Sequence, residues 1–241
     1  MATQSTADRP EASRTVIEVA LLTVLAFGIA LVGGVVFLVP LLVLGYDIQT
    51  TLVLAGSTAA SQVAMGGLAY AYARYRSIEV PVELPSVRAV AVAAGGVVLA
   101  LVVAIALSLL LAVLDLVPES VIGDVGAVDP TFFLALAALS VLVVAPIEEF
   151  LFRGVIQGRL RQRFGPAAAI AGSSLLFGSL HLANYAGEPI TIVAGALLIA
   201  CVGAIFGTLY ELTDNLAVPI LVHAIYNVVL LLLSYVAVTA V

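Results

Sequence analysis

The sequence has no lysine, one cysteine, two histidines and few charges, since only 10% of its 241 residues are charged. A soluble globular domain carries about 25% charged residues and about 45–50% apolar ones. This chain is 63% hydrophobic and has a mean hydropathy of +1.24, which is far outside that range. The composition therefore excludes an ordinary soluble domain and predicts a multi-pass protein of the cell membrane, embedded in the lipid bilayer.

The charge balance and the cysteine count exclude some classes of function. The acidic balance, a net charge of −6, provides no basic surface for nucleic acid, so we expect no nucleic-acid partner. The single cysteine, Cys201, excludes an intrachain disulfide and any CxxC metal site. It lies in an apolar run, where we expect it to be a small packing residue.

Uncharged runs divide the chain into hydrophobic segments, and most exceed the ~20 residues that span a bilayer. These runs cover residues 19–46, 48–73, 89–114, 130–147, 164–187, 189–210 and 215–241. The fourth run is shorter, but its helix is expected to continue through the charged residues that follow. We therefore predict an all-α, polytopic transmembrane helix bundle of about seven spans. Pro40, inside the long first run, leaves room for a re-entrant turn and an eighth span.

The arginines predict how the chain is organised and oriented. They are Arg9 and Arg14, then Arg74, Arg76 and Arg88, then Arg159, Arg161 and Arg163, with Arg153 alone inside a span. The three groups lie in alternate connecting segments, so seven crossings place them on one side, and the positive-inside rule makes that side cytoplasmic. We predict a disordered polar N-terminus (1–14) in the cytoplasm, helices 1–3 (15–128) and a four-helix core (129–241) with an external C-terminus.

Six polar residues in the last four helices stand out as candidates for a functional site. They are Glu148, Glu149, Arg153, His181, His223 and Asn227. Ionisable groups within spans usually face the bundle interior and mark a functional site. Glu148 lies about as far before the Gly-Pro turn at residues 165–166 as His181 lies after it, so antiparallel helices bring both to one depth. His223 could reach a similar level.

The spacing of these residues within each helix also indicates which side chains lie on the same helix face. Asn227 follows His223 by four residues and therefore lies on the same helix face. Arg153 follows Glu149 by four residues, in position to neutralise its charge. Such a set allows two chemistries: a divalent metal that activates a water, or Glu148 acting directly as general base beside oxyanion-stabilising groups. Both lead to hydrolysis.

Three motifs in this part of the chain resemble those of the CPBP family of intramembrane proteases. EEFLFRG (148–154), FGSLH (177–181) and HAIYN (223–227) are similar to the family motifs EExxxR, FxxxH and HxxxN/D. The family comprises type II CAAX prenyl endopeptidases and bacteriocin-processing or immunity proteins, and the resemblance covers roughly residues 131–235. It implies a multi-helix endopeptidase that cuts a membrane-associated, CAAX-like protein or peptide at a site opening toward the cytoplasm.

The resemblance also implies a role for each residue. Glu148 would be the catalytic carboxylate, with Glu149 and Arg153 in support, and His181 would hold the water or a metal. His223 and Asn227 would bind a metal or the oxyanion. If a metal is used, zinc is the expected ion, and its ligands would be Glu148, His181, His223 and Asn227.

Other interpretations remain open at this stage. Glu148, Glu149 and Arg153 could form a structural ion cluster, and Asn227 could join helices by a hydrogen bond. The chain could be a non-catalytic membrane scaffold or immunity factor on the same fold. A transporter would use the buried charges as an ion path, but it should show two repeated halves with broken helices, and no repeat is present.

Overall fold

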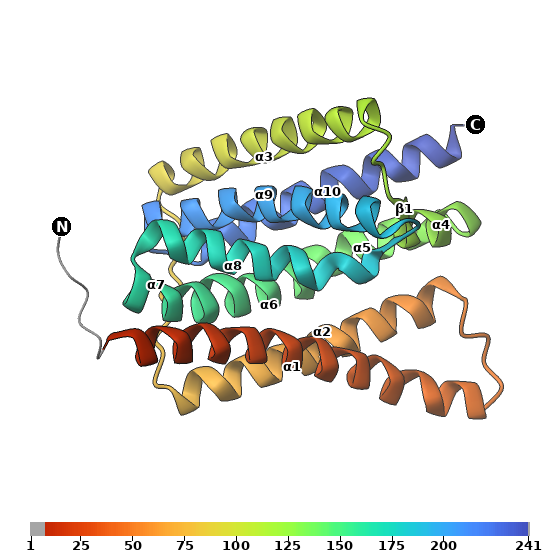
Figure 1. Ribbon diagram of the computed structural model, residues 1–241. Coiled ribbons are helices and arrows are strands. Elements are labelled where there is room, and N and C mark those ends of the chain that lie inside the picture. The colour runs from red at the N-terminus through yellow and green to blue at the C-terminus, as the bar shows by residue number, and fades with distance from the viewer. Residues whose placement is uncertain (1–7, 241) are drawn as a thin grey trace.

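The structure is a computed structural model of the chain and describes residues 8–240. Almost all of these residues are helical, and two short strands pair near one end of the bundle (Figure 1). In chain order the first half contains α1 (Asp8–Val43), α2 (Thr51–Tyr75), α3 (Val87–Val113), β1 (Glu119–Ser120), α4 (Val121–Val128) and α5 (Thr131–Leu139). The second half contains η1 (Ser140–Val144), α6 (Ala145–Glu149), η2 (Phe150–Gln157), α7 (Gly158–Phe164), α8 (Pro166–Leu180), η3 (His181–Asn184), β2 (Tyr185–Ala186), α9 (Pro189–Thr213) and α10 (Ala217–Thr239).

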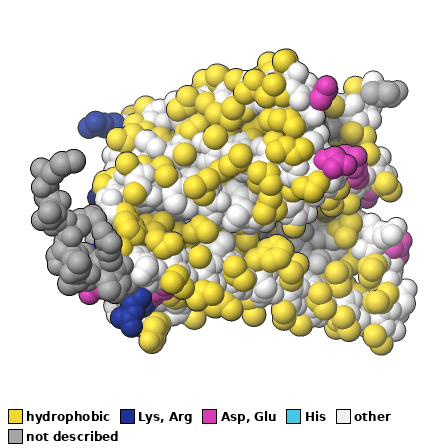
Figure 2. Space-filling model, viewed as in Figure 1, with side chains coloured by type: hydrophobic (Ala, Val, Ile, Leu, Met, Phe, Trp, Pro, Cys, Tyr) yellow, Lys and Arg dark blue, Asp and Glu magenta, His cyan; other side chains and the backbone are white. Residues whose placement is uncertain are grey.

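The described residues contain seven helical segments that are long and apolar enough to cross a membrane. The fourth of them, Thr131–Phe164, is the continuous run from α5 to α7, as the sequence predicted. Pro40 lies inside α1 near its end, so the first run forms one helix without a re-entrant turn. Apolar side chains cover much of the outer surface between the two ends, as expected for a protein whose solvent is lipid (Figure 2).

The first helix begins earlier than the sequence analysis placed it. Residues 8–14, assigned to a disordered N-terminus, form the first turns of α1, while residues 1–7 lie outside the described part of the chain. In this extension the Oε2 atom of Glu11 lies 3.8 Å from Nη1 of Arg163, so the start of α1 lies beside the end of α7.

The α5–α7 run is the central helix of the bundle, and its geometry places both glutamates in the interior. Every residue from 151 to 157 is buried, so this helix has neighbours on all sides. Two π-helical stretches, η1 and η2, flank α6, and the N–H of Ala145 bonds back five residues to the carbonyl of Ser140. Pro146 has no N–H to give. Widened turns of this kind recur at functional sites, and here they lie on either side of Glu148 and Glu149.

The fifth span is shorter than predicted and ends inside the bundle. The sequence suggested a helix to residue 187, but α8 stops at Leu180 and the chain continues as a short 3₁₀ turn and then strand β2. β2 pairs antiparallel with β1, with Ser120 opposite Tyr185. His181 is therefore the first residue after the helix rather than a residue within it, and no helix fills the space beyond its ring.

Candidate active site

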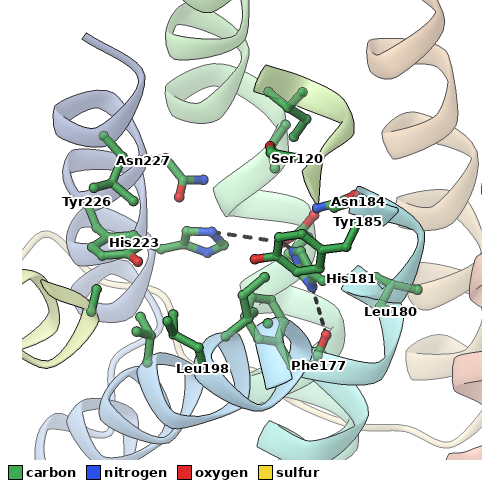
Figure 3. A pocket seen from close by; sticks show the side chains of 18 of the residues that line it. Ser120, Phe177, Leu180, His181, Asn184, Tyr185, Leu198, His223, Tyr226 and Asn227 are labelled. Atoms are coloured by element: carbon green, nitrogen blue, oxygen red, sulfur yellow. Dashed lines mark hydrogen bonds and ion pairs between the residues drawn. The ribbon is translucent and has the colours of Figure 1, made fainter. Parts of the chain in front are cut away.

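A cavity of about 790 Å³ lies between the helices on the side of His181 that α8 leaves open. Glu148, His181, His223 and Asn227 all line it, so the structure brings together four of the six predicted residues at its wall. Figure 3 shows the two histidines approaching from different elements, with His223 and Asn227 on α10. The remaining two predicted residues, Glu149 and Arg153, lie behind this wall and are completely buried.

The two carboxylate oxygens of Glu148, a residue of the cavity wall, have different surroundings. Its Oε1 accepts a hydrogen bond of 2.8 Å from Nε2 of Gln62 on α2. Its Oε2 is buried, has no hydrogen-bond partner among the described residues, and lies 3.8 Å from Nε2 of His181 and 3.9 Å from Nε2 of His223. One carboxylate oxygen and two imidazole nitrogens therefore converge at this point.

Both imidazole rings turn the same nitrogen toward Glu148, because their other nitrogens are held elsewhere. Nδ1 of His181 lies 2.8 Å from the backbone carbonyl oxygen of Phe177, and Nδ1 of His223 lies 2.8 Å from Oε1 of Glu149. Each acceptor requires an N–H at Nδ1, so in the neutral ring Nε2 carries the lone pair. This arrangement fixes the tautomer of a water-binding or metal-binding histidine.

Glu149 connects the histidine to the buried arginine. Its second oxygen, Oε2, lies 3.2 Å from Nε of Arg153, an ion pair between two side chains with no exposed surface. Arg153 also donates a hydrogen bond of 2.7 Å from Nη2 to the carbonyl oxygen of Gly203. The predicted pairing across one helical turn is therefore present, and it neutralises the carboxylate that does not face the cavity.

Aromatic rings complete the surroundings of Arg153 and the histidines. The guanidinium carbon lies 4.6 Å from the ring centroid of Phe177 and 5.6 Å from that of Phe206, within the range of cation–π attraction. Phe206 stacks on His223 at 5.0 Å, and Phe177 contacts both His181 and His223. Phe177 is thus a packing residue that shapes the cavity.

The cavity extends away from the arginine-bearing loops. Its far wall includes Pro118, Ser120 of β1 and Ile122 of α4, at the end of the bundle where Glu119 and Glu188 are exposed. The cytoplasmic location of the arginine end and the side to which the site opens stay predictions.

The arginine end of the central helix is covered by the connection between α2 and α3. The carbonyl oxygen of Pro81 accepts a hydrogen bond of 2.9 Å from the N–H of Leu216, and the N–H of Glu83 bonds to Asn215 at 3.1 Å. Val80 lies against Gly154, where an added Cβ would come within 2.8 Å of the valine. The connection therefore crosses from η2 to the start of α10 at this end of the bundle.

The donor atoms have the chemistry that divalent metals prefer, namely two imidazole nitrogens and a carboxylate oxygen. Their spacing does not yet form a metal centre, since within residues 8–240 no three His, Cys, Asp or Glu side chains are close enough to hold an ion. The separations of 3.8 and 3.9 Å from Glu148 to the two histidines fit an intervening water. A metal at this position stays a prediction.

Three residues of the site were missed by the sequence reasoning. Gln62 was overlooked because one neutral amide in an apolar helix is a weak signal, and Tyr185 because its strand was read as helix. Tyr226 lies beside Asn227 and packs against Phe206, and both tyrosines line the cavity (Figure 3). Burial raises the pKa of Tyr185, which lies outside the spans, and keeps its hydroxyl a hydrogen-bond donor at neutral pH.

Comparison with known proteins relates this geometry to a family. Residues 130–229 match the family model described as Rce1-like, type II CAAX prenyl endopeptidase Rce1-like. Neither the curated proteins nor the solved structures gave a match. The matched segment is less than half of the chain, but it contains all six residues that the sequence analysis selected. The segment from residue 130 to residue 229, which holds the candidate active site, is thus similar to type II CAAX prenyl endopeptidases of the Rce1-like kind, in agreement with the resemblance seen in the motifs.

Proposed function

We propose that the protein is an intramembrane endopeptidase in which Glu148 activates a water for attack on a peptide bond. One observation carries the proposal: Oε2 of Glu148 is buried, has no hydrogen-bond partner among the described residues, and faces the free nitrogens of two histidines at a cavity wall. Glu149 differs, because its Oε1 is hydrogen-bonded to His223 and its Oε2 forms an ion pair of 3.2 Å with Arg153, whereas Oε2 of Glu148 has no partner closer than 3.8 Å among the described residues. The family match supports peptide hydrolysis in a membrane.

The reaction follows from the positions of these groups. A water held between Glu148 and a histidine attacks the carbonyl carbon of the scissile peptide bond, and its proton passes to Glu148. The electron pair of the carbonyl moves to its oxygen, and the amide N–H of Asn227 stabilises that oxyanion. When the C–N bond breaks, Glu148 returns the proton to the leaving amine and becomes a carboxylate again.

Glu149 and Arg153 support this chemistry without touching the substrate. Glu149 orients His223 through Nδ1, which leaves Nε2 toward Glu148, and Arg153 balances the carboxylate. A divalent metal, zinc being the expected one, belongs to the proposal as an alternative to the metal-free form. Bound by Glu148, His181, His223 and Asn227, it would supply Lewis acidity and activate the water.

The proposed substrate is a membrane-associated protein or peptide. The cavity wall is mostly apolar, with polar groups gathered around Glu148 and the two histidines. An extended peptide carrying an apolar or lipid-modified side chain would place that group against the apolar wall and its backbone against the polar cluster. A CAAX-like sequence is the first candidate, in keeping with the family model that residues 130–229 match.

The test is cleavage of a membrane-tethered, CAAX-like peptide by the purified protein in lipid nanodiscs. Wild type is compared with Glu148→Gln, which keeps the size of the side chain and removes the base. We expect a loss of at least about 100-fold in the cleavage rate. The matched control is Glu188→Gln, an exposed glutamate outside the cavity, which should cleave like wild type. Cleavage that survives Glu148→Gln would reject the assignment of the base, and failure of wild type on a panel of such peptides would favour a non-proteolytic scaffold.

A further inference from the structure

One polar contact to the site comes from outside the segment that matches the family. Gln62 lies on α2, lines the cavity, and donates a hydrogen bond of 2.8 Å from Nε2 to Oε1 of Glu148. None of the three sequence motifs includes it. We propose that Gln62 is a positioning residue that sets which oxygen of Glu148 faces the reacting water. The proposal rests on the function proposed above.

Glu148 needs such a partner because, within residues 8–240, no other group is close enough to hydrogen-bond to its carboxylate, and the two histidine nitrogens lie 3.8 and 3.9 Å away. Glu149 is held by His223 on one oxygen and by Arg153 on the other. Among the described side chains, Gln62 is the one that donates a hydrogen bond to Glu148. The last torsion of a glutamate side chain is broad and roughly two-fold, so a free carboxylate would exchange its two oxygens easily. The amide keeps Oε1 bound and leaves Oε2 toward His181 and His223.

The orientation of the amide agrees with an ionised base. A carboxylate can only accept hydrogen bonds, so it requires the N–H side of the amide, and the opposite orientation would set two acceptors against each other. The remaining atom, Oε1 of Gln62, is buried and has no partner within the described part of the chain. A residue that served only to fill space would avoid this cost, because an apolar side chain of the same length leaves no polar atom unpaired.

Gln62 also gives the N-terminal helix pair a role in the reaction. α1 and α2 lie along one side of the bundle and pack against α5–α7 near the site (Figure 1). Through Gln62, α2 reaches the catalytic carboxylate directly. The first three helices, which carry none of the motifs, therefore contribute more than a path through the membrane.

The kinetic test compares Gln62→Met, which keeps the length of the side chain and removes the donor, with Thr58→Val. Thr58 lies one turn earlier on α2 and also lines the cavity, but its hydroxyl bonds to the carbonyl of Leu54 and not to Glu148. We expect Gln62→Met to lower kcat by roughly 10- to 100-fold, the range for a lost hydrogen bond to a charged group, with KM changed less than about two-fold. An unchanged kcat, or an equal loss in Thr58→Val, would overturn the proposal.

A second measurement needs no substrate and so separates this proposal from the proposed function. Subtracting the infrared spectrum of the Glu148→Gln variant from that of the protein with Glu148 isolates the carboxylate stretch of Glu148. We expect this band to shift in the Gln62→Met background and to stay in place in the Thr58→Val background. A band that Gln62→Met does not move would reject the positioning role even if wild type cleaves the peptide. A shifted band with no cleavage by wild type would retain the contact and reject the protease.

Discussion

His223 and Glu149, which are 74 positions apart in the sequence, form a buried hydrogen bond of 2.8 Å between two helices. This contact gives the two adjacent glutamates different surroundings. Oε1 of Glu149 is bonded to His223 and its Oε2 pairs with Arg153 at 3.2 Å, whereas Oε2 of Glu148 has no partner closer than 3.8 Å among the described residues. In the proposed mechanism Glu149 orients the histidine and Glu148 is the base.

Removing the buried arginine should destabilise the fold strongly. Arg153→Met leaves the charge of Glu149 without its cation in a site that excludes water, which costs about 3–5 kcal/mol in the free energy of unfolding. The double variant with Glu149→Gln should recover a large part of that loss, because no unpaired charge remains. Unfolding in detergent, followed by circular dichroism, measures both.

The control for the Arg153→Met variant is Arg161→Met. Arg161 pairs with Glu211 at 3.2 Å, but its side chain is 47% exposed, so its loss should cost less than about 1 kcal/mol. Equal destabilisation by Arg153→Met and Arg161→Met would mean that the buried pair contributes no more than a surface pair.

Substitution of a histidine tests whether a metal takes part in the reaction. His181→Ala removes a nitrogen that faces Glu148 without disturbing the pair between Glu149 and Arg153. We expect the cleavage rate to fall by about 10²- to 10⁴-fold while the unfolding temperature stays close to that of wild type. Elemental analysis of the same samples separates the two mechanisms. Zinc present in wild type, lost from His181→Ala and removed together with activity by a chelator supports the metal form. Full activity in metal-free protein excludes it.

The helix count was predictable from the sequence, and so was the approach of Glu148, His181, His223 and Asn227 to one cavity. Long uncharged runs identify spans because a bilayer tolerates little else. The isolated histidines and the Glu148 segment stand out for the same reason, since polar groups in lipid are costly. The relation between Glu149 and Arg153 followed from helical spacing alone.

Other features depended on contacts that a single sequence does not display. The end of α8 at Leu180 is fixed by the 3₁₀ turn and by the pairing of β2 with β1, which comes from a distant part of the chain. The first turns of α1 lie beside the end of α7, where Glu11 is 3.8 Å from Arg163. Gln62 became significant only when α2 was seen beside Glu148. In each case the determining partner is remote in sequence, so local patterns could not reveal it.

Close packing of α8 on α9 should control the position of His181. An added Cβ on Gly178 would come within 2.4 Å of the backbone carbonyl oxygen of Ala196, which cannot move aside easily. Gly178→Ala should therefore destabilise the protein by about 1–3 kcal/mol and displace the end of α8, lowering the cleavage rate. Gly67→Ala is the matched control, since its Cβ would meet nothing within 4 Å and alanine favours a helix. Equal stability of the two variants would contradict this account of the α8–α9 contact.

The orientation of the chain decides from which side a substrate reaches the cavity. Glu79 and Glu188 are exposed glutamates at opposite ends of the bundle, near the arginine loops and near β2 respectively. In a Cys201→Ala background, the positive-inside rule predicts that Glu188→Cys reacts with a membrane-impermeant maleimide in intact cells. Glu79→Cys should react only after permeabilisation. Because the cavity extends toward the β1–β2 end, this result would mean that the substrate approaches from the outer half of the membrane. The reverse labelling pattern would reject the predicted orientation and place the cavity on the cytoplasmic side.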